Sequence, residues 1–379
     1  MNDLIDALHL REPVEAIRSK VVPRHRSSVW YYLGGFALFL FGVQIATGVL
    51  LLLYYQPTPE AANQSVELIM KRVPFGSLVR SLHSRSSNAL IAVVFLHMFS
   101  TFFMKSYRKP REIMWLTGVI LLLLMLGFGF TGYLLPWDLT AYFATRIGTE
   151  VPGMLPIVGE AIVGLLRGAR SVSGATLSRL FALHVAVLPL ITIVIAGAHV
   201  TMTALFGSSV PPGAKITSQT KFLPRYVLGE AILWLCGLAV LLTVAVLHPW
   251  ELGPAYDMTK PVEPPAGVHP EWYFMFLYQT LKYIPEWAAV GLYTVVLVFW
   301  SLVPWLDRKA KQGERSPLFT WIGIILIAGM LVLTTLAYLS VSNEVAGQLP
   351  SFGSQATSEP FPLHQPAVDR DTTLRSKGK

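Results

Sequence analysis

Seven stretches of the chain are apolar over roughly the 20 residues that a helix needs to cross the hydrocarbon core of a bilayer. Polar segments rich in proline, glycine and charge separate them. The pattern therefore predicts an all-α membrane protein with seven transmembrane helices. The predicted spans are 30–55, 77–103, 113–135, 179–205, 227–247, 288–305 and 318–341.

Basic residues gather in alternate loops between these helices. Lys and Arg number 5, 4, 3 and 4 in the loops 11–26, 105–111, 215–225 and 308–315, but 2, 3 and 2 in the intervening loops 56–76, 137–178 and 248–287. The positive-inside rule places the N-terminus on the cytoplasmic, matrix or stromal side and the intervening loops outside. Of these settings we expect a bacterial inner membrane, with the N-terminus on the cytoplasmic side. The net charge of +8 thus comes from basic residues at the edge of the membrane. We therefore expect these residues to contact lipid rather than nucleic acid.

The two ends of the chain are polar. Residues 1–29 carry apolar side chains at helical spacing, namely Leu4, Ile5, Leu8, Val14 and Ile17. This pattern predicts a helix on the cytoplasmic membrane surface rather than a cleavable signal. The tail 342–379 is polar and contains proline, so we expect it to be extended or bound to a partner.

Two predicted helices each carry two histidines near opposite ends. His83 and His97 are 14 residues apart, and His184 and His199 are 15 apart. Each interval rises about 21 to 22 Å and returns to within about 60° of the same helix face. Side by side, the two helices would pair His83 with His184 near the outer surface and His97 with His199 near the inner one.

Imidazole is costly in hydrocarbon, so these histidines need a joint explanation. A lone histidine is readily explained as a hydrogen-bonded group inside a helix bundle. Two matched pairs instead favour two stacked b-type haems, each held between two histidines without a covalent bond. The predicted architecture is a four-helix dihaem bundle plus three further helices.

Glycines recur at the same interval on the first and third helices. Gly34 and Gly48 are 14 residues apart, and so are Gly118 and Gly132. Glycine allows another group to approach a helix closely, so we expect these four to make room for the haem edges. Packing glycines are common in membrane helices, and only the matching interval singles these out.

Three further polar residues bear on this hypothesis. Arg80 and Arg179 lie shortly before His83 and His184 and could pair with haem propionates or snorkel to the interface. The single cysteine, Cys236, excludes a Cys-x-x-Cys-His attachment site, an internal disulfide and an iron–sulfur cluster held by this chain alone. We expect its thiol to be buried inside the fifth helix.

Two long loops lie on the predicted outer side, at the level of the first histidine pair. One follows Pro136-Trp137-Asp138, and the other ends in Pro270-Glu271-Trp272-Tyr273. Loops of this length between membrane helices are seldom mere connections. We therefore expect a pocket for a second reactant on this side.

The four histidines with the Pro-Trp and Pro-Glu-Trp-Tyr motifs, in this order, resemble cytochrome b, the quinol-oxidising membrane subunit of Rieske/cytochrome b complexes. The resemblance covers about residues 22–341. Details such as Lys109-Pro-Arg-Glu112 and the 15-residue histidine interval favour the photosynthetic-type branch. That branch usually divides its haem part and its three-helix part between two chains. Here they look fused, with a haem domain at 30–206, a linker at 207–226 and a C-terminal domain at 227–341.

The resemblance implies a proton-translocating quinol:cytochrome c, or plastocyanin-like, oxidoreductase. Quinol would be oxidised at the outer face, with one electron passing to a Rieske iron–sulfur protein and the other through the outer haem to the inner haem. Quinone would then be reduced at the inner face, which builds a proton gradient. The implied partners are the Rieske protein, a c-type cytochrome subunit or soluble acceptor, and a second copy of the complex in a homodimer.

The same resemblance suggests roles for five residues. Glu271, with a pKa raised by its apolar surroundings, would accept a proton from quinol. Tyr273 would position the quinol, and Tyr133 would line the pocket. Glu230 would supply a proton at the inner quinone site. Tyr32 stands where the photosynthetic branch has the cysteine of a covalent third haem, so we expect no such haem.

Two other classes stay open at this point. A dihaem membrane anchor of a dehydrogenase or hydrogenase would pass electrons without a bifurcating outer quinol site, although the two long outer loops and Glu271 argue against it. A transporter could use the buried histidines as proton relays. An optical spectrum separates the transporter, since it would lack a dithionite-reduced b-type band.

Overall fold

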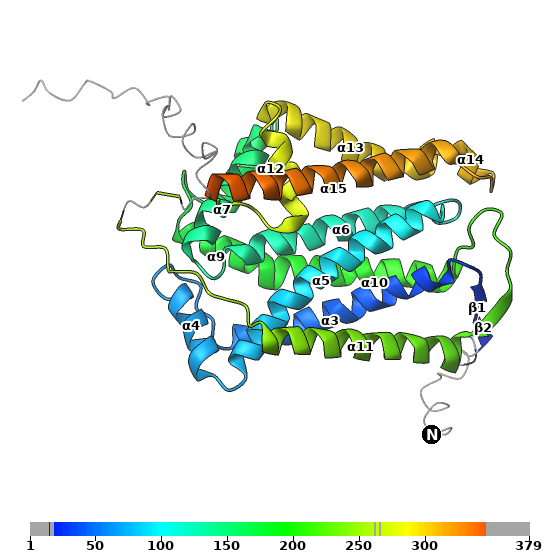
Figure 1. The fold of residues 1–379 in the computed structure, drawn as a ribbon, viewed down its shortest axis with the longest axis horizontal. Helices are drawn as coiled ribbons and strands as arrows, with labels where there is room; N and C mark the ends of the chain where they lie inside the picture. Colours follow the sequence, from blue (N-terminus) through cyan, green and yellow to red (C-terminus); the bar gives the residue numbers. More distant parts are fainter. Residues whose placement is uncertain (1–14, 16–18, 261–262, 265–266, 346–379) are drawn as a thin grey trace, which may run out of the picture.

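The protein is described here by a computed structural model that covers residues 15, 19–260, 263–264 and 267–345. Within these residues, seven helical spans are long and apolar enough to cross a membrane, which confirms the predicted fold class. The spans lie side by side in one bundle (Figure 1). The expected surface helix of residues 1–29 falls almost entirely outside the described residues, as does the tail beyond residue 345.

The spans begin and end close to their predicted positions. They are α3 (Tyr32–Leu52), α5 (Gly76–Phe103), α6 (Glu112–Tyr133), α10 (Leu188–Phe206), α11 (Val227–Leu247), α13 (Glu286–Leu306) and α15 (Pro317–Val345). A 3-10 turn, η1 (Ser28–Tyr31), leads into α3. The fourth span is composite, because α9 (Gly174–Ala182) continues through a π-helical turn, η3 (Leu183–Val187), into α10.

Shorter elements cover the end of the bundle that carries the long loops. They are α4 (Ala62–Arg72), α7 (Leu139–Glu150), η2 (Val151–Met154), α8 (Gly159–Arg167), η5 (Trp272–Phe274) and α12 (Met275–Leu281). The sequence did not single out these helices, although a capping signal exists. The Asp138 carboxylate begins α7 by accepting a hydrogen bond from the Ala141 amide at 2.8 Å.

The connections at the opposite end of the bundle (Figure 1) contain the loops that are rich in Lys and Arg. Here β1 (Val21–Arg24) pairs antiparallel with β2 (Ser218–Lys221), with Val21 opposite Lys221. The turn η4 (Phe222–Tyr226) leads from β2 into α11, and α14 (Arg308–Lys311) joins α13 to α15. Since Lys and Arg concentrate at this end, we refer to it as the inner end and to the other as the outer end.

The long helices pack against one another across the predicted domain boundary at residue 226, and the division into domains stays a prediction. Helix α3 packs along α5, α6 packs along α10, and α11 covers one side of α3 and α5. Because α11 uses only one face for these contacts, its opposite face points outward. The expectation of a buried Cys236 is therefore wrong, since this thiol is exposed.

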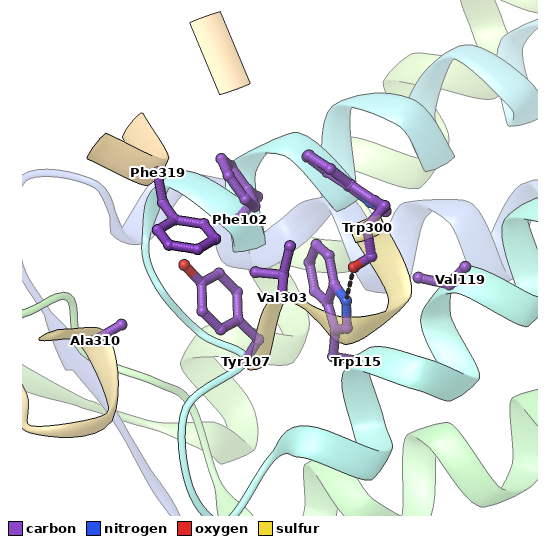
Figure 2. Close-up of a cluster of buried hydrophobic side chains, with 8 residues drawn as sticks. All are labelled: Phe102, Tyr107, Trp115, Val119, Trp300, Val303, Ala310 and Phe319. Carbon is purple, nitrogen blue, oxygen red and sulfur yellow. Dashed lines mark hydrogen bonds between the residues drawn. The ribbon is translucent and has the colours of Figure 1, made fainter. Parts of the chain in front are cut away.

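Aromatic side chains attach the last helices to the bundle at the inner end. Phe102, Trp115 and Trp300 form the middle of a buried cluster that joins α5, α6 and α13 (Figure 2). The Trp115 indole donates a hydrogen bond to the Trp300 carbonyl at 2.9 Å. Beside it, the Tyr107 hydroxyl donates to Asp307 Oδ2 at 2.7 Å. The cluster therefore satisfies its polar atoms while it excludes solvent.

Candidate functional site

The structure brings the four histidines together as two pairs. The ring centroids of His83 and His184 lie 6.4 Å apart, and those of His97 and His199 lie 6.5 Å apart. A metal held between two imidazole nitrogens at about 2.0 Å from each would put the ring centroids roughly 6.3 Å apart. Both pairs thus have the spacing that two axial imidazoles need, which fits the predicted ligation.

Threonine hydroxyls fix three of the four imidazoles. Nδ1 of His83 lies 2.8 Å from Thr47 Oγ1, Nδ1 of His199 lies 2.9 Å from Thr117 Oγ1, and Nδ1 of His184 lies 3.0 Å from Thr131 Oγ1. Each hydroxyl also donates to a backbone carbonyl in its own helix, those of Val43, Met114 and Gly127.

A hydroxyl has one proton, so a threonine that donates to a carbonyl must accept a hydrogen bond from the imidazole. Nδ1 of each of these three histidines therefore carries the proton, and Nε2 is left with a free lone pair. This is the tautomer that a metal ligand requires. Nδ1 of His97 is buried and has no hydrogen-bond partner among the described residues.

Each predicted glycine faces one of the four histidines. A Cβ atom at Gly48 or Gly132 would lie 3.3 or 2.7 Å from Cε1 of His83 or His184. At the inner level, Gly34 and Gly118 face His97 and His199 at 3.2 and 3.4 Å in the same way. The glycines therefore leave room for the imidazole rings, and the expected room for haem edges at these positions stays a prediction.

The π-helical turn explains why the second histidine interval is longer by one residue. The turn Leu183–Val187 contains His184 and is followed directly by α10, which carries His199. A π turn accommodates an extra residue in one turn of helix, so 15 residues here replace the 14 of a regular helix. Because of this turn, His184 and His199 can lie opposite His83 and His97 of α5 at the same two levels.

Arg80 and Arg179 bond to backbone carbonyls. The buried Arg80 guanidinium donates to the carbonyls of Trp250 and, at 3.0 Å, of Glu251, which ties the loop after α11 to α5. The exposed Arg179 donates to the Gly164 and Leu165 carbonyls at 2.6 and 2.9 Å, near the C-terminal end of α8. The suggested pairing of either residue with a propionate stays a prediction.

Glu271 and Tyr273 lie in a buried region at the outer end. The Trp272 indole docks the segment on α5 by donating to Asn88 Oδ1 at 2.8 Å. Burial raises the pKa of the Glu271 carboxyl, and the charge of His269 partly offsets this. Burial also raises the pKa of the Tyr273 phenol, with further contributions from Glu271 and Tyr133, so the three residues lie within electrostatic reach of one another.

One turn of α6 connects this region to the outer histidines. Thr131 and Gly132 contact His184, and Tyr133 follows directly. Gly129 lies against Tyr273, whose hydroxyl occupies the space that a Cβ would need. Residues 129–133 therefore contact an outer histidine and the aromatic segment that carries Glu271.

Glu230 lies in a comparable position at the inner end. It is 7% exposed, and its carboxylate lies against Gly35, where an added Cβ would come within 2.6 Å of either oxygen. Gly35 follows Gly34, which faces His97. The ring of Tyr226, beside Glu230, stacks on Tyr32 at 4.8 Å between centroids.

The histidine-binding threonines and Gly129 were not among the residues predicted from the sequence. A signal for the threonines exists, because each directly precedes one of the predicted glycines, in Thr47-Gly48, Thr117-Gly118 and Thr131-Gly132. Gly129 carried no signal of its own, because its role depends on a segment that returns from a distant part of the chain.

Two family models match the chain. The model described as cytochrome b/b6/petB matches residues 17–207, and the model described as cytochrome b(C-terminal)/b6/petD matches residues 258–352. The first contains all four histidines, and the second contains Glu271 and Tyr273. Both family segments are thus present in one polypeptide.

Named relatives and a solved structure agree with these matches. The chain is 47% identical over 337 residues to the cytochrome b subunit of a cytochrome bc complex from Chlorobaculum thiosulfatiphilum, which covers 87% of this chain and 78% of the relative. It is 46% identical over 197 residues to cytochrome b6 of Heliobacterium mobile, or 52% of this chain and 92% of that one.

Among solved structures, a chain of a hyperthermophilic respiratory complex III matches with a TM-score of 0.75 and 28% identity, covering 92% of this chain and 96% of that one. The relatives favour the first of the three functional classes that the sequence left open. With both family segments in one polypeptide, the chain belongs to the cytochrome b family.

Proposed function

We propose that this chain oxidises quinol at its outer end and reduces quinone at its inner end by way of two b-type haems. It is the cytochrome b subunit, and so the catalytic membrane subunit, of a bc/b6f-type quinol oxidoreductase complex. The observation that carries the proposal is the pair of matched imidazole clamps, three of whose rings are held in the tautomer that leaves Nε2 free.

Membership of the cytochrome b family implies haem binding. His83 and His184 would hold the outer haem, and His97 and His199 the inner one, both without a covalent bond. When bound, the haems supply one-electron transfer between the two ends of the bundle. Tyr32, packed on Tyr226 and Gly229, supports the expectation that no third haem is attached covalently.

At the outer end, the protein's own residues would bind quinol and take its protons. Tyr133 and Tyr273 present phenols beside the Glu271 carboxylate. A carboxylate whose pKa is raised by burial is a stronger base than an exposed one, so Glu271 can accept a quinol proton. Quinol oxidation would supply one electron to a Rieske iron–sulfur protein and the other to the haem that His83 and His184 would hold.

At the inner end, Glu230 would deliver a proton to reduced quinone. Its burial against Gly35 and its closeness to the His97 level support this role. Proton uptake inside and release outside would together build a proton gradient.

The proposed setting is a bacterial inner membrane, with the N-terminus on the cytoplasmic side because the basic loops gather at the inner end. The chain is an integral membrane protein of a cytochrome bc complex, which implies partners of the Rieske and cytochrome c kinds. We propose that the acceptor is a c-type cytochrome or plastocyanin-like protein, that lipid surrounds the spans, and that the complex is a homodimer.

Haem counting in histidine variants of the purified complex tests the proposal. His83→Gly and His184→Gly should each remove the outer haem, and His97→Gly and His199→Gly the inner one. His248→Gly is the matched control, because this histidine is exposed at the outer end, and it should keep both haems. Two haems per chain in all four ligand variants would refute the assignment.

A further inference from the structure

Three of the four histidines share one local arrangement, and the fourth lacks it. On α3, Thr47 precedes Gly48, which faces His83, and on α6 the same dipeptide occurs at Thr117-Gly118 and Thr131-Gly132. Leu33 precedes Gly34, which faces His97. Leu33 is therefore the one position among these four where the glycine that faces a histidine is not preceded by threonine.

The sequence positions around His97 match those around His83, although the ring of His97 turns Cε1 and Nε2 toward Gly34 whereas that of His83 turns Cε1 and Nδ1 toward Gly48. Positions 33 and 34 lie 14 residues before Thr47 and Gly48 on α3, and His97 lies 14 residues after His83 on the antiparallel α5. The same interval on both helices preserves the pairing. Leu33 packs against the core cluster formed by α3, α5 and α6, so its side chain is directed toward the bundle interior.

The missing hydroxyl leaves a polar atom without a partner. Nδ1 of His97 is buried, with no hydrogen-bond partner among the described residues, whereas Nδ1 of His199 across the same clamp bonds Thr117. An imidazole that donates its N–H to an acceptor becomes a more basic, more electron-donating ligand. The two rings of the inner clamp should therefore differ in basicity.

From this we infer that position 33 tunes the reduction potential of the inner haem through His97. Leucine there withholds an acceptor from Nδ1–H, so His97 donates less electron density and stabilises oxidised iron less than the other three rings do. A threonine would supply the acceptor and lower the potential. The inference rests on the proposed ligation by His97, and it makes Leu33 a positioning residue that acts through that ring.

A redox titration of the purified complex tests this with matched variants. Leu33→Thr and Leu33→Val differ only by a hydroxyl against a methyl group, so both remove the same leucine side chain and the comparison isolates the hydroxyl. At a fixed ambient potential, Leu33→Thr should shift the inner haem roughly three- to tenfold toward the oxidised form relative to Leu33→Val. Tenfold corresponds to about 59 mV for one electron. The outer haem should not move.

Thr117→Val provides the reverse test on the same haem. It removes the acceptor of His199 and should raise the inner potential, while Thr47→Val and Thr131→Val should raise only the outer one. Equal potentials in Leu33→Thr and Leu33→Val would overturn the inference, and so would an unchanged potential in Thr117→Val. The second result stays informative even if Leu33→Thr fails to assemble.

Failure of the inference can be distinguished from failure of the proposed function. If His97→Gly removes one haem and the two Leu33 variants still titrate alike, only the tuning role is lost. If His97→Gly retains both haems, the ligation is wrong, and the inference fails with it.

Discussion

Both ends of the bundle connect a histidine to a buried or half-buried glutamate through a short glycine-containing segment, but they do so differently. At the outer end, residues 129–133 of α6 contact His184 and the segment that carries Glu271. At the inner end, Gly34 and Gly35 on α3 contact His97 and Glu230. The same plan therefore serves two levels of one helix bundle.

The difference lies in where each acid is placed. Glu271 lies on the connection before η5, with two phenols nearby, outside the spanning helices. Glu230 lies within the span that includes α11, with its carboxylate close against Gly35. A proton acceptor on a connection, such as Glu271, is well placed to pass its proton outward. The side chain of Glu230 packs closely against Gly35, so it has less freedom to move between a proton donor and an acceptor. We therefore predict that replacing Glu271 slows quinol oxidation more than replacing Glu230 slows quinone reduction.

The largest expected effect comes from Gly132→Ala. A Cβ there would lie 2.7 Å from Cε1 of His184, closer than carbon atoms pack, so the imidazole must move and the outer haem should be mostly lost. Gly118→Ala is the matched inner variant. Its Cβ would lie 3.4 Å from His199, and the inner haem should be retained. Equal haem content in the two purified variants would contradict this contrast.

Glu271→Gln should slow quinol oxidation by about 10²-fold, the lower range of a general base's contribution. The amide keeps the shape and removes the basicity, so both haems should stay bound with unchanged spectra. Pre-steady-state reduction of the outer haem, with the inner quinone site blocked, measures the effect. Glu286→Gln, at an exposed acid of the outer end, is the control. A wild-type rate in fully assembled Glu271→Gln would end the catalytic assignment.

The pH dependence of the same step should also depend on Glu271. Because burial raises its pKa, the carboxyl takes up a proton at a higher pH than an exposed glutamate does, and it then loses its basicity. The rate should rise with pH through this pKa and level off above it. Rates measured from acidic to neutral pH should show the rise in the wild type and none in Glu271→Gln. An identical profile in both would assign the titration to another group.

Glu230→Gln should have a smaller effect, below the roughly 10²-fold expected for Glu271→Gln. It removes the proposed proton donor near the level of His97, so reoxidation of the haem that His97 and His199 would hold should slow and lose part of its pH dependence. Flash or rapid-mixing kinetics of the inner haem measure this. An unchanged rate across pH would leave Glu230 a structural role only.

Much of this comparison was predictable from the sequence, because it depends on intervals along single helices. Hydropathy gave the seven spans, and the spacing of His83, His97, His184 and His199 gave the two levels. The resemblance identified the family, which the family models confirm. The spans and the histidine intervals are properties of single helices, so they can be predicted without knowing which helices contact one another.

The rest depended on contacts between distant segments. Arg80 bonds carbonyls about 170 residues away, and the side chain of Tyr273 lies against Gly129 on another helix. Cys236 is exposed because α11 packs by one face only, which hydropathy does not reveal in a helix that is apolar on all sides beyond its first turn. The threonine partners were within reach of sequence reasoning, since each precedes a singled-out glycine.

The smallest expected effect is on stability, at the inner attachment of the C-terminal helices. Tyr107 and Asp307 are each 1% exposed and joined by a 2.7 Å hydrogen bond. Tyr107→Phe leaves Asp307 Oδ2 without this donor, although Oδ1 still accepts from the Ala310 amide at 3.1 Å. A buried acceptor that loses its partner costs about 1–3 kcal/mol, so the Tm of the complex should fall while both haem spectra stay unchanged.

Tyr54→Phe, at an outer-end tyrosine that is 46% exposed, should change stability by less than about 0.5 kcal/mol. Equal Tm shifts in the two variants would mean that the buried hydrogen bond does not help to attach the C-terminal helices α13, α14 and α15 to the rest of the bundle.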